Sequence, residues 1–91
     1  MANSRSAIKR IRQNQKRRLR NRIYRGRART SITQARQAIS AEEMETAREK
    51  TMAAVRSLDK AAQKGVVHKN NASRRKSRLM KQLVALEKTQ A

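Results

Sequence analysis

Residues 40–65, SAEEMETAREKTMAAVRSLDKAAQKG, specify one helix more completely than any other stretch of the chain. Ser40 and Glu43 have the spacing of a capping box, in which each side chain accepts a hydrogen bond from the other residue's backbone N–H. Gly65 is placed to end the helix, because glycine adopts the left-handed conformation of a helix terminus without strain. Between these ends, apolar positions at helical spacing predict a face packed on a core, made of Met44, Ala47, Thr51, Ala54, Val55, Leu58 and Ala62.

Residues 4–40 are predicted to form one long helix with two apolar stripes. At 100° per residue, the stripe within residues 8–23 lies almost opposite the stripe within residues 24–39. We expect the second stripe to pack into a bundle and the first to lie mostly against something external. A kink near Gly26 is the competing explanation, and periodicity does not choose between them. The first stripe consists of Ile8, Ile11, Leu19 and Ile23, and the second of Tyr24, Ala28, Ile32, Ala35 and Ile39.

The third helix is predicted to follow a short connector at residues 66–69, with Asn70 or Asn71 as its cap. Two short connections make the helices antiparallel neighbours, so the predicted fold is an all-α, antiparallel three-helix bundle with an elongated, highly basic N-terminal helix. Residues 1–91 form a single domain, in which 1–25 project from a bundle formed by 26–91. The apolar face of the third helix comprises Ala72, Leu79, Met80, Leu83 and Leu86.

Charge is segregated along the chain, whose 25 Lys and Arg against 6 Asp and Glu give a net charge of +19. Residues 1–41 contain 13 bases and no acid, residues 42–68 are neutral, and residues 69–91 carry a net charge of +6. A segment without acids cannot neutralise itself, so a polyanion or counterions must offset its field. This pattern indicates a scaffold that presents basic surfaces to nucleic acid.

Several other classes of protein are disfavoured. The chain has one histidine, no cysteine and no paired carboxylates in a predicted cleft, so we expect no enzyme, no metal site, no cofactor and no small-molecule substrate. No stretch approaches the ~18 apolar residues of a membrane span. The acid-free N-terminus resembles an organelle transit peptide in composition, but it merges into a predicted helix without a processing boundary.

The densest cluster of bases, at residues 16–22, lies all round the predicted helix and favours arginine, whose planar guanidinium suits phosphate. Because this segment repels itself, we expect it to fray in the free protein and to become helical on binding. Tyr24 is either a residue of the core between helices or a stacking partner for a base, and His68 is either a phosphate or base contact or a solvated connector residue. With one aromatic residue, recognition should rest on phosphates and RNA shape.

Specific motifs resemble the bacterial and plastid small-subunit ribosomal protein S-twenty family. The N-terminal ones are Ala2-Asn3, SAIKR at residues 6–10 and KRRLRN at residues 16–21. The most telling run is DKAAQKGVVHKN at residues 59–70, followed by Ala72 and RRKSRL at residues 74–79. The likeness covers nearly the whole chain and is weak only over residues 41–57; Asn71 and Ser73 stand where the family more often has alanine.

The resemblance implies a three-helix bundle with a long first helix that binds small-subunit, 16S-type rRNA directly and early in assembly. The implied partners are the 5′ domain and the 3′ minor domain of that rRNA and other components of the small ribosomal subunit. The implied location is the ribosome, in the bacterial cytoplasm or the plastid stroma. The rRNA-binding residues implied are Ser4, Lys9, Arg10, Arg12, Lys16, Arg17, Arg20 and Arg25 in the first helix, and His68, Lys69, Asn70, Arg74, Arg75 and Arg78 around the third.

An architectural protein that binds double-stranded DNA is the alternative, since a long basic helix also fits a major groove. No leucine heptad or helix-turn-helix is visible that would dimerise or orient that helix. A basic amphipathic helix acting on anionic membranes is a third class, and its interrupted, opposed apolar faces disfavour it.

Overall fold

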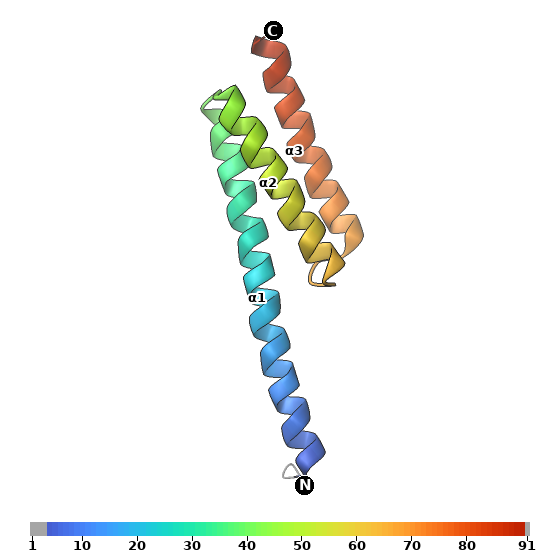
Figure 1. Cartoon of the computed structure of the whole chain (residues 1–91). Helices are drawn as coiled ribbons and strands as arrows, with labels where there is room; N and C mark the ends of the chain where they lie inside the picture. The colour runs from blue at the N-terminus through green and yellow to red at the C-terminus, as the bar shows by residue number, and fades with distance from the viewer. Residues whose placement is uncertain (1–3, 91) are drawn as a thin grey trace.

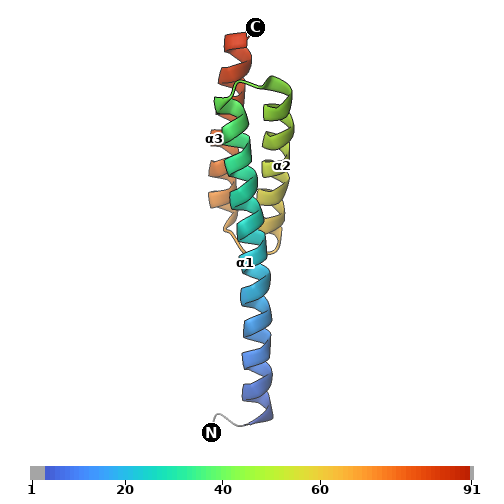
Figure 2. The same ribbon diagram turned by 90° about the vertical axis from the view of Figure 1, so that its left-hand side faces the viewer.

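The computed structural model describes residues 4–90, which form three helices (Figure 1). They are α1 (Arg5–Ser40), α2 (Met44–Gln63) and α3 (Lys69–Gln90). α2 runs back along the C-terminal half of α1 and α3 packs beside both, while the N-terminal half of α1 extends alone (Figures 1 and 2). The molecule measures 66 × 21 × 14 Å. The predicted all-α fold of three packed helices with a long first helix is confirmed. Ala2 and Asn3 of the N-terminal motif lie outside the described residues.

α1 continues through Gly26 without a break, so the kink near that residue is not found (Figure 1). The side chain of Ser4 caps the helix by accepting a hydrogen bond from the Ala7 N–H at 3.2 Å. The first apolar stripe is exposed, with Ile8 at 43% and Leu19 at 62%. The opposed stripes therefore belong to one continuous helix that is packed over only half its length.

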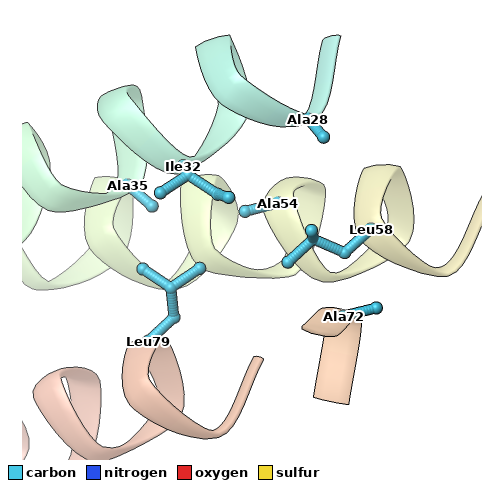
Figure 3. Packing of buried hydrophobic residues seen from close by; sticks show 7 residues of the cluster. All are labelled: Ala28, Ile32, Ala35, Ala54, Leu58, Ala72 and Leu79. Carbon is cyan, nitrogen blue, oxygen red and sulfur yellow. The ribbon is translucent and has the colours of Figure 1, made fainter. Parts of the chain in front are cut away.

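The core lies where the second stripe of α1 meets the other two helices. Its main cluster joins Ala28, Ile32 and Ala35 of α1 to Ala54 and Leu58 of α2 and to Ala72 and Leu79 of α3 (Figure 3). A smaller cluster of Ala38, Ala47, Leu83 and Leu86 lies nearer the free end of α3. Because alanines supply much of the contact, the helices approach closely and few large side chains fill the interior.

Three residues predicted on core faces lie outside the core clusters: Met80, Tyr24 and Val55, of which Val55 is half-buried. Met80 is 40% exposed, since it is next to Leu79 and points away from the bundle. Tyr24 is half-buried and outside both clusters, and the guanidinium of Arg27 lies 5.9 Å from its ring centroid. Tyr24 sits where α1 leaves the bundle, so the core interpretation of this residue is wrong.

The first turn shows that the predicted capping box is also wrong. The backbone N–H of Glu43 donates to the carbonyl of Ala38 at 3.3 Å. The N–H of Glu42, whose φ of 57° is left-handed, donates to the carbonyl of Ile39 at 3.1 Å. These two bonds form a Schellman motif, which ends a helix and keeps Ser40 within the last turn of α1. α2 then starts without a side-chain cap.

The second turn repeats this arrangement with the predicted glycine. Gly65 has a φ of 72° and donates to the carbonyl of Ala62 at 3.0 Å, while Val66 donates to that of Ala61 at 2.9 Å. Val66 and Ala61 are both buried, which is the apolar contact that usually accompanies the motif. The prediction that Gly65 closes α2 is confirmed.

α3 is capped by His68, not by Asn70 or Asn71. The Asn70 N–H donates to Nδ1 of His68 at 3.1 Å, and the Ala72 N–H donates to the carbonyl of His68 at the same distance. Both asparagines lie inside the first helical turn. His68 is therefore part of the structure of the turn rather than only a solvated connector residue.

The two turns give a matched prediction, because one left-handed position holds Glu42 and the other Gly65. Glu42→Gly should raise the free energy of unfolding by up to about 1 kcal/mol, since glycine removes the left-handed strain but adds unfolded-state entropy. Gly65→Ala should lower it by about 1 kcal/mol, because alanine introduces that strain. Urea unfolding followed by circular dichroism measures both, and shifts of the same sign would contradict the assignment.

Candidate nucleic-acid interface

The projecting half of α1 is a rod of bases. All the bases from Arg5 to Arg22 are exposed, and no acid lies among them. The candidates Lys9, Arg10, Arg12, Lys16, Arg17 and Arg20 belong to this rod, and Ser4 lies at its tip. Because helix geometry spreads them round the axis, the rod presents positive charge in every direction.

A second cationic site lies at the other end of the exposed segment, where α1 meets the turn between α2 and α3. Arg25 and Arg29 of α1, His68 of the turn and Arg75 of α3 line a hollow of about 280 Å³. The rest of its lining is Ala28, Val66, Val67 and Asn71, so no carboxylate borders it. We call this feature the arginine hollow. Three candidates that are up to 50 residues apart in the sequence, Arg25, His68 and Arg75, meet here.

The hydrogen bond at the cap orients His68 for contact with an anion. Since Nδ1 accepts the Asn70 N–H at 3.1 Å, the ring proton lies on Nε2, which is a donor. The valines of the turn form an apolar floor beside it. The hollow thus offers guanidinium and imidazole N–H donors from exposed side chains around one space, an arrangement that suits a phosphate group.

Other candidates around α3 do not line the hollow. Lys69, Asn70, Arg74 and Arg78 are exposed on α3. Within residues 4–90, the ion pairs are Lys76 Nζ to Asp59 Oδ1 at 2.6 Å and Arg48 Nε to Glu87 Oε1 at 3.3 Å. None of the predicted site residues takes part in them, so their charge is available to a partner.

Sequence reasoning missed Arg29 and Asn71. Each lies four residues, about one helical turn, from a candidate that was chosen: Arg29 follows Arg25, and Asn71 precedes Arg75. Helical spacing from the chosen arginines was therefore the signal that could have found them.

Five of the six acids lie away from this basic surface, and the sixth, Asp59, is paired with Lys76. Glu42, Glu43, Glu45 and Glu49 lie in the first turn or early α2, and Glu87 lies beside Arg48 near the end of α3. We call the end with these five residues the acidic end, although Arg36, Arg48 and Lys88 lie near them and offset most of their charge, and the rod is the basic end. Within the part of the chain described, no group of three or more His, Asp or Glu could hold a metal ion. None of the three described helices combines the length and apolar character needed to cross a bilayer.

The fold and these surfaces define a class: small, very basic α-helical proteins that display their charge on one long helix and at its junction with a bundle. The chain belongs to the ribosomal protein S20 family, whose family model matches residues 2–84. This confirms the S-twenty resemblance, and membership in a ribosomal protein family confirms that the chain is not an enzyme.

Relatives match nearly end to end. The chain is 50% identical to small ribosomal subunit protein bS20 of Thermomicrobium roseum, over 97% of this chain and 89% of the relative. It is 48% identical to bS20 of Thermobifida fusca, over 100% of this chain and 99% of the relative. It is 54% identical to bS20 of Roseiflexus sp., over 89% and 88% respectively.

Proposed function

We propose that this chain is a structural component of the small ribosomal subunit that binds 16S-type rRNA directly and helps its assembly by bridging RNA segments. The arginine hollow carries this proposal, because it gives the protein a second cationic site, fixed on the bundle, besides the rod. One rigid body with two such sites can hold two RNA segments at a set separation. The family assignment supports the ribosomal partner.

The partners proposed are the 5′ domain and the 3′ minor domain of the rRNA, with other components of the subunit nearby. Residues 1–91 act as one domain, in which residues 1–25 project and residues 26–91 form the bundle. The exposed first stripe packs on ribose and base surfaces, since its apolar side chains have no partner within the described chain. The location proposed is the ribosome, in a bacterial cytoplasm or a plastid stroma.

Binding works through phosphate neutralisation. The contacts proposed in α1 are Ser4, Lys9, Arg10, Arg12, Lys16, Arg17, Arg20 and Arg25, and those around α3 are His68, Lys69, Asn70, Arg74, Arg75 and Arg78. Each neutralised phosphate releases counterions, so the affinity depends on salt. With 6–10 phosphate contacts, raising the salt from 50 to 200 mM would lower the affinity by roughly 10³–10⁵. Specificity comes from RNA shape, because only a folded RNA places two anionic segments at the spacing of the two sites.

A salt-titrated competition tests the function. The full chain is offered the folded 5′ domain of small-subunit rRNA against duplex DNA and an unrelated structured RNA. We expect a preference for the rRNA that survives physiological salt. Equal binding to every polyanion would contradict the proposal, and a preference for duplex DNA would favour the architectural alternative.

The free protein should contain less helix than the three complete helices of the fold. Residues 5–22 lie outside the core clusters, and their like charges repel, so this part of α1 should fray in dilute buffer. Adding the rRNA 5′ domain should restore it. Circular dichroism of the protein alone and in complex measures the change, and complete helicity at low salt without RNA would contradict the expectation.

A further inference from the structure

Gly26 lies in the middle of the 36-residue helix α1, where glycine is unfavourable relative to alanine because it costs more conformational entropy. Nothing among residues 4–90 requires glycine at this position. Its φ is not positive, as that of Gly65 is. A Cβ built at Gly26 would meet no atom within 4 Å. Neither backbone conformation nor internal packing therefore explains the missing side chain.

The surroundings of Gly26 differ on its two sides. On one side it borders a hollow of about 700 Å³, to which Leu19 and Ile23 of the exposed stripe contribute apolar surface, and whose lining also includes Arg22, Arg27, Thr30, Ser31 and Ser57. On the other it borders a hollow of about 400 Å³ lined by four arginines: Arg18, Arg22, Arg25 and Arg29. Arg18 and Arg22 are one helical turn apart, as are Arg25 and Arg29, so the charges form a row along the helix. Bare backbone thus lies between an apolar strip, formed by Leu19 and Ile23, and a cationic strip, formed by the four arginines, of which Arg22 borders both hollows.

We infer that one strand of the rRNA crosses α1 at Gly26, with its phosphates on the arginines and its ribose against the helix backbone and the apolar strip. A nucleic acid strand presents these two chemistries side by side, and the absence of a side chain at Gly26 lets its sugar edge approach the backbone closely. A second copy of this chain is a poor fit, because each copy carries a net charge of +19. The inference rests on the proposed function and adds the place where a strand crosses.

Gly26→Leu tests this contact, with Ala53→Leu as the control at another exposed helical position, on the neutral helix α2. In the free protein, the leucine at residue 26 should raise the melting temperature by about 3–6 °C, because it enters open space and improves helix propensity. Affinity for the rRNA 5′ domain should nevertheless fall by about tenfold or more, because the side chain occupies the space of the sugar. Gly26→Ala should stabilise the free protein at least as much, because alanine has the higher helix propensity, and should weaken rRNA binding less, because its side chain is smaller.

The control should bind rRNA within about twofold of the wild type, as expected for a surface substitution outside the contact. A hydroxyl-radical footprint should lose protection over one short RNA segment in Gly26→Leu and keep the rest.

Unchanged rRNA affinity in Gly26→Leu, while the wild type still prefers rRNA, would overturn this inference alone. Equal losses for rRNA and duplex DNA would overturn the assignment of the surface to rRNA, and wild-type self-association abolished by Gly26→Leu would assign it to a second copy. A wild type without preference for rRNA would instead refute the proposed function.

Discussion

Replacing the three arginines of the arginine hollow together, as Arg25→Gln, Arg29→Gln and Arg75→Gln, should weaken binding to the rRNA 5′ domain by roughly 10²–10³-fold at fixed salt. These three arginines line one hollow that has no carboxylate in its lining, so each substitution removes a charge-assisted hydrogen bond to phosphate. The slope of log affinity against log salt should also become shallower, by about 0.9 for each phosphate that is no longer neutralised. Filter binding or fluorescence anisotropy over a salt series measures both quantities.

The control removes the same amount of charge elsewhere, as Arg36→Gln, Arg48→Gln and Lys88→Gln. These residues lie near the acidic end of the bundle, and Arg48 is already paired with Glu87. We expect the control to weaken binding far less than the hollow variant, because it lowers only the long-range field, which salt screens. Equal reductions in the two variants would mean that the hollow contributes only to net charge.

Leu58→Ala should lower the free energy of unfolding of the bundle by about 2–5 kcal/mol. Leu58 is fully buried between α1 and α3 and is one of the largest side chains in the main core cluster (Figure 3). Many of its neighbours are alanines on closely packed helices, which cannot move in to fill the cavity. Since small domains are stable by only about 5–15 kcal/mol, this change would remove much of the total.

Urea unfolding monitored by circular dichroism measures this effect, with Met52→Ala as the matched control. Met52 lies on the same helix but is 46% exposed, so its truncation should change stability by no more than about 0.5 kcal/mol. An unchanged midpoint for Leu58→Ala would mean that Leu58 is not part of the core. Because Leu58 is distant from the rod, the variant that remains folded should still bind rRNA.

The helices could be predicted from the sequence because each carries a periodic apolar face and few interruptions. The caps could not. Ser40 has the residue type and spacing of a capping box, yet the apolar stripe of α1 continues to Ile39 and holds Ser40 in that helix. His68 precedes two asparagines with better capping propensity, but the Schellman motif at Gly65 sets where the chain leaves α2 and leaves His68 at the cap position.

The exposure of the bases in the rod could be predicted, because it follows from charge density alone. The arginine hollow depends on tertiary structure instead. α2 carries the chain back along α1 for 20 residues, and this length brings His68 beside Arg25. Periodicity gives the length of a helix only to within a turn, and one turn decides which arginines converge.

The separation of the acidic end from the basic end has a consequence for how the protein meets its target. One end of a body 66 Å long carries only bases, whereas at the other end the acids offset the bases, so the charge is strongly asymmetric and the field of a polyanion exerts a torque on the molecule. Before any contact forms, the protein should therefore turn so that the N-terminal tip of α1 leads and the end with Glu42 and Glu87 trails. Encounters in the wrong orientation become rarer, and association is faster at low ionic strength than the net charge alone would produce.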